Sequence, residues 1–210
     1  ISNKIRNYTK RKALELNLEF FDLKNQNGDI RNLMIRTTTT NEIMVLIQFY
    51  KYSKKAENLL ELIKNEFDEI TSIMYVINSK PNDTIYDLEI LCFSGKNYIT
   101  EKIGELLFKI SAKSFFQTNS YQTSKLYNIV KRFANLKGNE IVYDLYSGIG
   151  TISLFLSKEA KKIIGIETVK DAVQAAKSNS KLNNISNCKF IHGDVKDIIA
   201  KPIKGIKKPD

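Results

Sequence analysis

One segment, Asp144-Leu145-Tyr146-Ser147-Gly148-Ile149-Gly150, restricts the fold of this chain more than any other. It follows the apolar stretch Ile141-Val142-Tyr143 directly and precedes residues 151–158, which have helical spacing. Two glycines let the backbone turn tightly and approach a ligand closely, and the start of the helix supplies free N–H groups. The segment therefore predicts a nucleotide-type binding turn between a buried strand and a helix.

The residues around this turn alternate between helical and strand patterns. We expect helices over 122–134, 151–158 and 170–183, and strands over 140–145, 162–167 and 189–191. Such alternation is typical of a parallel, doubly wound α/β sheet, and we place this domain at residues 113–210. A fourth strand would be due at 208–210, after a Lys-rich ending over 201–208, and the first residue is Ile1 rather than Met. We therefore expect a fragment of a longer protein.

Residues 1–112 predict a separate, mixed α+β domain. Strands over 33–36 and 42–50, joined by the Thr-rich tract 37–41, favour an antiparallel pair. Residues 56–67 have apolar side chains at helical spacing and should form an amphipathic helix on that sheet. The remaining expected elements are an opening helix over 1–16 and short strands over 72–77, 86–93, 98–101 and 107–110.

The glycine turn could serve several ligands, and its neighbours narrow the choice. The third glycine of a dinucleotide fingerprint is absent because Ser153 stands in its place, and no Gly-Lys-Ser/Thr of a phosphate loop follows. The acid Asp144, four positions before Gly148, suits a cationic ligand instead. S-adenosylmethionine, with its sulfonium and amino groups, is such a ligand.

Two further acids follow the next two strands. Glu167 ends Gly165-Ile166-Glu167 and should accept hydrogen bonds from both hydroxyls of a ribose, whereas Asp194 in His192-Gly193-Asp194 could receive or adjoin an adenine amino group. Either acid alone could only cap the helix that follows it. Together with the glycine turn they lie at the carboxyl ends of successive parallel strands, where open α/β sheets bind ligands.

The net charge of +10 at pH 7 suits a polyanionic partner, and most of the excess lies in residues 113–210. In the opening helix five basic residues precede any acid, which makes either a phosphate-contacting surface or a solvated helix face: Lys4, Arg6, Lys10, Arg11 and Lys12. The two cysteines, Cys92 and Cys188, stand far apart and read as buried residues on strands. With one histidine, His192, they predict no metal site. No apolar run or leader pattern indicates a membrane span or export, so we expect a cytoplasmic protein.

Four motifs in order resemble the RNA uracil-5-methyltransferases. They are Ser114-Phe115-Phe116-Gln117-Thr118-Asn119, the turn from Asp144 to Gly150, Gly165-Ile166-Glu167, and Asn179 with Leu182-Asn183-Asn184. The first is the specific one, because generic methyltransferases share the later motifs but lack it. Residues 30–36 and 41–45 also resemble that family's central domain.

The resemblance implies a Rossmann-like S-adenosylmethionine methyltransferase domain, truncated at its C-terminal side and preceded by an α+β central domain that helps to hold RNA. At matching positions, S-adenosylmethionine would contact the glycine turn at Gly148 and the side chains of Gln117, Tyr146, Glu167 and Asp194, with Thr151 as a further candidate. Ser147 stands where many members have a cysteine that is not the nucleophile. The family's Asp-Pro motif, catalytic cysteine and general base lie beyond the equivalent of Asp210, so no catalytic residue is assigned.

The implied activity is methylation of a uridine at C5, with 23S rRNA preferred over tRNA as substrate, and the chain alone is expected to be inactive. In that chemistry a cysteine thiolate adds to C6 so that C5 can accept the methyl group. Two alternatives stay open. One is another S-adenosylmethionine-dependent enzyme that methylates RNA bases, for instance at an exocyclic amine, and the other is an RNA-binding module without activity.

Overall fold

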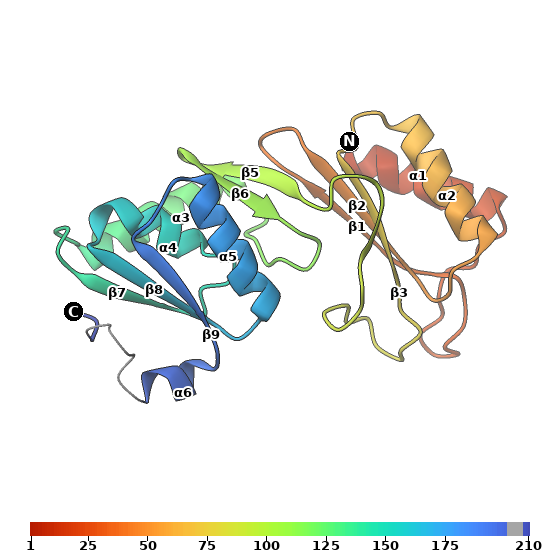
Figure 1. The fold of residues 1–210 in the computed structure, drawn as a ribbon. Helices are drawn as coiled ribbons and strands as arrows, with labels where there is room; N and C mark the ends of the chain where they lie inside the picture. Colours follow the sequence, from red (N-terminus) through yellow and green to blue (C-terminus); the bar gives the residue numbers. More distant parts are fainter. Residues whose placement is uncertain (201–207) are drawn as a thin grey trace. The chain divides into compact units, whose positions relative to one another are not determined.

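In a computed structural model, which describes residues 1–200 and 208–210, the chain divides into two compact units (Figure 1). The first unit comprises Ile1–Ile99 with Ser111–Lys113, and the second unit comprises Thr100–Ile110 with Ser114–Asp210. Apart from Lys208, the Lys-rich ending predicted over 201–208 lies outside the described residues. No helix in the described part of the chain is long and apolar enough to cross a membrane.

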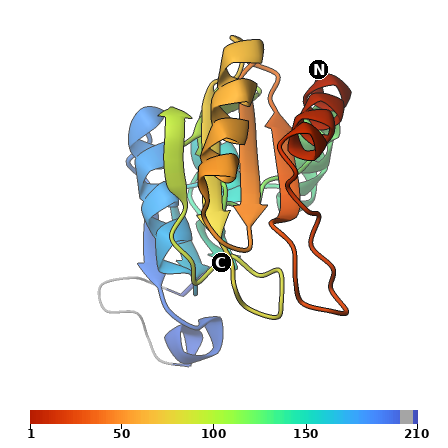
Figure 2. The same ribbon diagram turned by 90° about the vertical axis from the view of Figure 1, so that its right-hand side faces the viewer.

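The first unit is a four-stranded sheet with two helices on one face (Figures 1 and 2). Strands β1 and β2 form the predicted antiparallel pair, β2 and β3 run parallel, and β4 pairs with β3 in the antiparallel sense, in the order β1-β2-β3-β4. The elements are α1 (Ser2–Glu15), β1 (Ile30–Thr37), β2 (Ile43–Phe49), α2 (Lys54–Glu66), β3 (Ser72–Ile77) and β4 (Leu91–Gly95). The predicted opening helix, hairpin and amphipathic helix are confirmed.

Helix α2 shows why this unit folds as it does. Its first turn is capped by Ser53, whose Oγ accepts a hydrogen bond from the Ala56 N–H at 3.2 Å. Its buried residues Leu59, Leu60 and Ile63 pack against alternate residues of β2. Since all seven residues of β2 are buried, this strand forms the centre of the sheet.

The strand predicted over 86–93 is wrong in its first half, because β4 begins only at Leu91. Residues 86–88 form a turn and a bend instead of extending along β3. The Leu88 N–H donates to the Ile85 carbonyl oxygen at 3.1 Å, and the Lys113 ammonium donates to the Tyr86 carbonyl oxygen at 3.1 Å. These bonds satisfy backbone groups that the predicted strand would have paired in a ladder.

The second unit contains the predicted parallel sheet, in the order β7-β8-β9. Its elements are β5 (Ile99–Ile103), β6 (Leu106–Ile110), α3 (Ser120–Ala134), β7 (Ile141–Leu145), α4 (Thr151–Leu156), β8 (Lys162–Glu167), α5 (Lys170–Leu182), β9 (Cys188–His192) and α6 (Val195–Ile199). A 3₁₀ turn, Ser157–Glu159, ends the helix predicted over 151–158. The last residue, Asp210, lies beside the start of β7, where its N–H donates to the Ile141 carbonyl oxygen at 3.1 Å.

The division differs from the boundary predicted near residue 113. Residues 100–110, which form most of the β5–β6 hairpin, belong to the second unit because Asn179 of α5 and Asn183, which follows α5, hold β6. The Asn183 side chain accepts from the Leu107 N–H at 2.9 Å and donates to the Leu107 carbonyl oxygen at 2.7 Å, and the Asn179 Oδ1 accepts from the Lys109 N–H at 2.9 Å. These bonds join residues about 70 positions apart, which strand propensity cannot indicate.

Candidate functional site

The glycine turn between β7 and α4 has three residues in the left-handed region. The φ angles of Tyr146, Gly148 and Gly150 are 64°, 54° and 83°. At Gly150 a side chain would also be excluded, because a Cβ there would lie 2.8 Å from the Phe190 ring and 3.1 Å from the Ala176 Cβ. At Gly148 the Cβ direction is open, with no atom of the described chain within 4 Å. The two glycines therefore differ. The absence of a side chain at Gly150 lets Phe190 and Ala176 pack against the turn, whereas at Gly148 it leaves open space above the turn.

The Glu167 carboxylate is bonded to both segments that flank the site. Its Oε2 accepts from the Gly148 N–H at 3.0 Å, and its Oε1 accepts from the Val169 N–H at 2.8 Å and from the Thr168 hydroxyl at 3.1 Å. The residue is only 9% exposed. Glu167 thus fixes the glycine turn relative to the start of α5 and presents the edge of its carboxylate at the end of β8.

Backbone hydrogen bonds tie the carboxyl ends of the three strands together. The Ser147 N–H donates to the Ile166 carbonyl oxygen, and the Gly193 N–H donates to the Glu167 carbonyl oxygen, both at 3.0 Å. A ring nitrogen of His192 lies 2.9 Å from the Thr168 carbonyl oxygen. The glycine turn, Glu167 and the His192–Asp194 segment, predicted from separate motifs, therefore lie in one place.

Asp144, which precedes the glycines, has a structural partner on α4. Its Oδ2 accepts hydrogen bonds from the Ser153 N–H at 3.1 Å and the Ser153 hydroxyl at 2.6 Å, so it caps the first turn of α4. Burial raises the pKa of the Asp144 carboxyl, although the bonds from Ser153 oppose this effect. Asp144 therefore connects the end of β7 to the first turn of α4.

Two of the predicted site residues also have structural partners. Asp194 caps α6, because its Oδ1 accepts from the Lys196 N–H at 2.8 Å, and its Oδ2 takes no part in that cap. The Thr151 hydroxyl accepts a hydrogen bond from the buried Tyr127 hydroxyl at 2.8 Å. Thr151 is thereby held at the start of α4, facing α3 rather than open solvent.

The Ser-Phe-Phe-Gln-x-Asn motif divides into structural and exposed positions. Asn119 caps α3 through a hydrogen bond from the Gln122 N–H at 3.1 Å, and Phe116 packs on Phe108 with ring centroids 6.1 Å apart. Gln117 is exposed, and Phe115 is 75% exposed. One aromatic of the pair therefore contributes to the core, as expected, while Phe115 and Gln117 are presented outward.

Asn179, which the sequence places in a motif without a role, has a structural role at the site. It is fully buried, and its amide donates to the Ile149 carbonyl oxygen at 3.3 Å while its Oδ1 accepts from β6. It therefore connects the glycine turn, α5 and the β5–β6 hairpin. Its place in a family-like motif was noted, but a buried asparagine on a helix gives no sign of which backbone groups it satisfies.

The cysteines differ from each other more than predicted. Cys92 on β4 is exposed rather than buried, and Cys188 on β9 is partly buried. Burial raises the pKa of the Cys188 thiol to about 12, which keeps it from forming the thiolate that a nucleophile requires. Within residues 1–200 and 208–210, no group of three or more His, Cys, Asp or Glu side chains could hold a metal ion.

Known proteins match the chain in sequence. An uncharacterized RNA methyltransferase of Porphyromonas gingivalis is 52% identical over 181 residues, which cover 86% of this chain and 39% of that protein. Another, of Bacteroides thetaiotaomicron, is 46% identical over 206 residues, which cover 96% of this chain and 45% of that protein. The chain thus spans less than half the length of these relatives.

Solved structures match the fold. The tRNA (uracil-54, C5)-methyltransferase of Pyrococcus abyssi, in complex with S-adenosylhomocysteine, is similar with a TM-score of 0.73 and 26% identity, over 90% of this chain and 45% of that one. The tRNA m1G37 methyltransferase of M. jannaschii shares the fold alone, with a TM-score of 0.52 and 18% identity over 84% of this chain and 52% of that one.

A family model described as tRNA (Uracil-5-)-methyltransferase matches residues 21–201, which is most of the chain. The match includes the glycine turn, the acid of β8, Asn179 and Asn183, so it covers the residues whose geometry is described above. The resemblance noted in the sequence is confirmed. The chain belongs to the uracil-5-methyltransferases, a family of S-adenosylmethionine-dependent RNA methyltransferases.

Proposed function

We propose that this chain holds S-adenosylmethionine at the carboxyl ends of β7, β8 and β9, for methylation of a uridine at C5 in RNA. The observation that carries the proposal is the Glu167 carboxylate, which lies at the end of β8 and is bonded to the turn at Gly148. When bound, S-adenosylmethionine supplies a methyl group on a sulfonium that a nucleophile can take. The residues of this chain bind and orient it.

The acceptor positions of Glu167 fit a ribose. A carboxylate offers about four acceptor positions, and three protein donors occupy three of them. The Thr168 hydroxyl can rotate to donate elsewhere, whereas the two N–H groups are fixed by the backbone. Two positions then remain for the two ribose hydroxyls, one on each carboxylate oxygen.

The other predicted contacts have free groups at matching places. Tyr146 is 70% exposed beside the turn, so its ring can pack on a ligand above Gly148. Asp194 uses one oxygen to cap α6 and leaves the other for an adenine amino group. The exposed Gln117 amide can donate and accept at once, which suits the methionine end of the cofactor. Thr151 is the least favoured contact, because its hydroxyl is already paired with Tyr127.

Gly148→Ala is expected to lower the affinity for S-adenosylhomocysteine about tenfold, because the added methyl group occupies the space that the ligand needs. It should also lower the free energy of unfolding by about 1 to 2 kcal/mol, because Gly148 is in the left-handed region. Gly104→Ala is the matched control, since Gly104 has a φ of 57°, close to the 54° of Gly148, and equally open surroundings, but lies in the β5–β6 turn. Calorimetric titration and thermal melting of both variants test this. Equal affinities for the two variants would contradict a ligand above Gly148.

The proposed substrate is RNA, with 23S rRNA as the finer proposal and the cytoplasm as the compartment. Transfer RNA is the second candidate, since the matching family model and the Pyrococcus abyssi enzyme both carry tRNA in their names. The thiol that must add to C6 is neither Cys92 nor Cys188, because the family's catalytic cysteine lies beyond the equivalent of Asp210. Burial also raises the pKa of the Cys188 thiol to about 12, which disfavours its thiolate. The activity is therefore proposed for the whole protein.

The 210-residue chain is expected to bind S-adenosylhomocysteine but to transfer no methyl group. Labelled methyl transfer to unmodified 23S rRNA and to unmodified tRNA would be compared for this chain and for a version extended to the length of its relatives. Transfer by the extended version to one RNA identifies the substrate. Transfer by the 210-residue chain itself would contradict the need for a further thiol, and failure of this chain to bind S-adenosylhomocysteine would favour an RNA-binding module instead.

A further inference from the structure

We propose that a cavity of the first unit, between α1, the segment at Phe20 and Phe21, and the start of β1, binds one unstacked nucleotide of single-stranded RNA. The inference rests on the proposed RNA substrate but not on the cofactor site. The cavity has a volume of about 450 Å³, within the range of about 300 to 1,000 Å³ typical of small-molecule pockets. It is lined by Arg6, Thr9, Lys10, Phe20, Phe21, Ile30, Arg31, Asn32 and Leu33.

Aromatic side chains supply a surface for a base. Phe20 is 48% exposed although it lies at the wall of the cavity, and a base that stacked on its ring would cover that apolar area. Phe21 lies beside it, and its ring is tilted against the Tyr50 ring at a centroid distance of 5.1 Å. The exposed Asn32 amide, also in the lining, can donate to and accept from a base edge.

Arg31 and Phe21 form one wall of the cavity, and contacts within the protein hold the Arg31 side chain in place. The Arg31 guanidinium lies 4.0 Å from the centroid of the Phe21 ring, and it donates to two carbonyl oxygens and to the Asp83 carboxylate, at 2.9 Å from its Nη2. Because its donors are used and its charge is compensated, Arg31 positions the aromatic wall rather than a phosphate. A preformed wall loses little conformational entropy when a base stacks on it.

The side of the cavity formed by α1 carries positive charge that no carboxylate of the described residues compensates. Arg6 and Lys10 are four residues apart on α1 and so lie on one side of the helix. Neither forms an ion pair with a carboxylate in the described ranges, whereas Lys12 pairs with Glu15 at 2.6 Å. Of the opening basic cluster, Arg6 and Lys10 therefore have both the position and the free charge to contact the phosphates on either side of a bound base.

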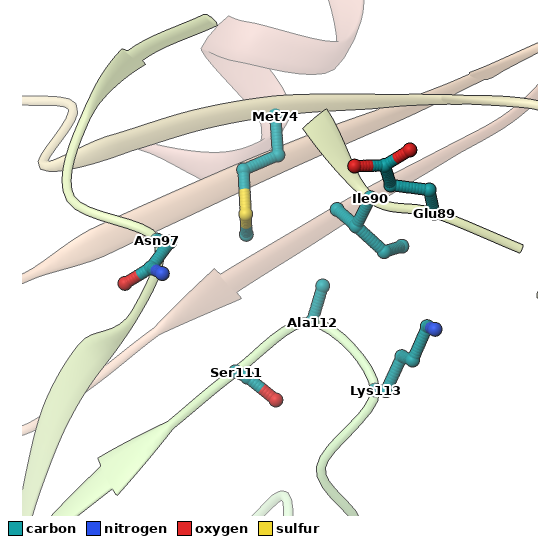
Figure 3. Close-up of a pocket in the computed structure, with 7 residues that line it drawn as sticks. All are labelled: Met74, Glu89, Ile90, Asn97, Ser111, Ala112 and Lys113. Atoms are coloured by element: carbon teal, nitrogen blue, oxygen red, sulfur yellow. The ribbon is translucent and has the colours of Figure 1, made fainter. Parts of the chain in front are cut away.

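A second cavity of this unit contrasts with the first (Figure 3). It has a volume of about 260 Å³, below the usual range for a ligand, and apolar Met74, Ile90 and Ala112 line it. Its two charged residues, Glu89 and Lys113, have opposite signs. Of these two cavities, the Phe20 cavity is therefore the one that favours a polyanion.

The experiment measures anisotropy of labelled single-stranded RNA of about ten nucleotides with the 210-residue chain and its variants. Phe20→Ala should weaken binding at least about fivefold, with an unchanged slope of log affinity against log salt, because stacking involves no counterion release. Phe20→Trp should retain the affinity. Lys10→Ser should reduce the slope by about 0.7, the value for one phosphate contact on a single strand.

Matched controls come from the neighbouring loop. Leu23 is exposed and Lys24 is exposed, and neither lines the cavity, so Leu23→Ala and Lys24→Ser should leave affinity and slope unchanged. A duplex of the same sequence should bind without dependence on Phe20, since its bases are already stacked. Equal losses for Phe20→Ala and Leu23→Ala, equal Phe20 dependence for duplex and single strand, or no RNA binding by the unmodified chain would each overturn the proposal.

The same variants separate this inference from the proposed function. Phe20→Ala should leave the affinity for S-adenosylhomocysteine unchanged, because Phe20 lies in the first unit and the cofactor residues lie in the second. RNA binding that is insensitive to Phe20, with normal cofactor binding, rejects the nucleotide cavity alone. If the unmodified chain binds RNA in a Phe20-dependent way but does not bind S-adenosylhomocysteine, the proposed function alone is rejected.

Discussion

Glu167→Ala is expected to lower the affinity for S-adenosylhomocysteine at least about tenfold and to lower the melting temperature as well. Hydrogen bonds to a charged acceptor contribute about 1.5 to 3 kcal/mol each, and this change removes two proposed bonds from the ribose. It also leaves the N–H groups of Gly148 and Val169 without their acceptor. Titration calorimetry on the folded variant measures the first effect, and thermal unfolding measures the second.

The control for this variant is Glu140→Ala. Glu140 also accepts backbone hydrogen bonds, from the Lys137 N–H at 2.9 Å and the Asn139 N–H at 3.0 Å, but it precedes β7, at the opposite end of that strand from the glycine turn. Its loss should reduce stability without changing cofactor affinity. If Glu167→Ala and Glu140→Ala had the same dissociation constant, the assignment of Glu167 to the ribose would be wrong.

Gly150→Ala is expected to lower the free energy of unfolding by about 2 to 5 kcal/mol, the largest stability loss among the changes considered. A left-handed residue with a Cβ costs about 1 to 2 kcal/mol, and insertion of a methyl group into a packed core costs about 1 to 3 kcal/mol. The core atoms concerned belong to Phe190 and Ala176, which join β9 to α5. Urea-induced unfolding measures the difference.

Gly138→Ala isolates the two contributions. Gly138 has a φ of 94°, close to the 83° of Gly150, but no described atom lies within 4 Å of its Cβ direction. Its replacement should therefore cost only the backbone term, about 1 to 2 kcal/mol. Equal losses for the two variants would mean that the Phe190 ring moves aside at no cost and that contact with the core does not restrict the turn.

The parallel sheet was predictable because its strands and helices are continuous and differ in period. The apolar runs of β7 and β8 are short and bounded by turn residues, while α5 repeats apolar residues with helical spacing. The segment at 86–90 was not predictable from its own residues, because the Lys113 side chain that donates to the Tyr86 carbonyl oxygen lies 27 positions later in the chain. The same holds for the hairpin at β6, which Asn179 and Asn183 assign to the second unit.

For the candidate site, the sequence indicated where the glycine turn and the acidic residues lie better than it indicated what each acidic residue does. Parallel strands bring their carboxyl ends to one edge, so the glycine turn, Glu167 and Asp194 were expected together, and the geometry agrees. Which carboxylate oxygens accept hydrogen bonds from neighbouring helices depends on tertiary contacts, which residue spacing does not reveal. Asp144 is held by Ser153, and one oxygen of Asp194 by α6, whereas residues of the same type with the same spacing could have faced a ligand.

The sheet of the first unit has a consequence for the order of events during synthesis. Strand β1 pairs with the next strand in the chain, and β2 reaches β3 through a single helix, with Met44 opposite Ser72. Strand β4 adds the remaining pairing, to β3, and ends at Gly95. All strands of this sheet are therefore available well before the glycine turn is translated. Since domains generally fold as units, and the N-terminal unit folds first, the first unit can form while the cofactor site is still unmade.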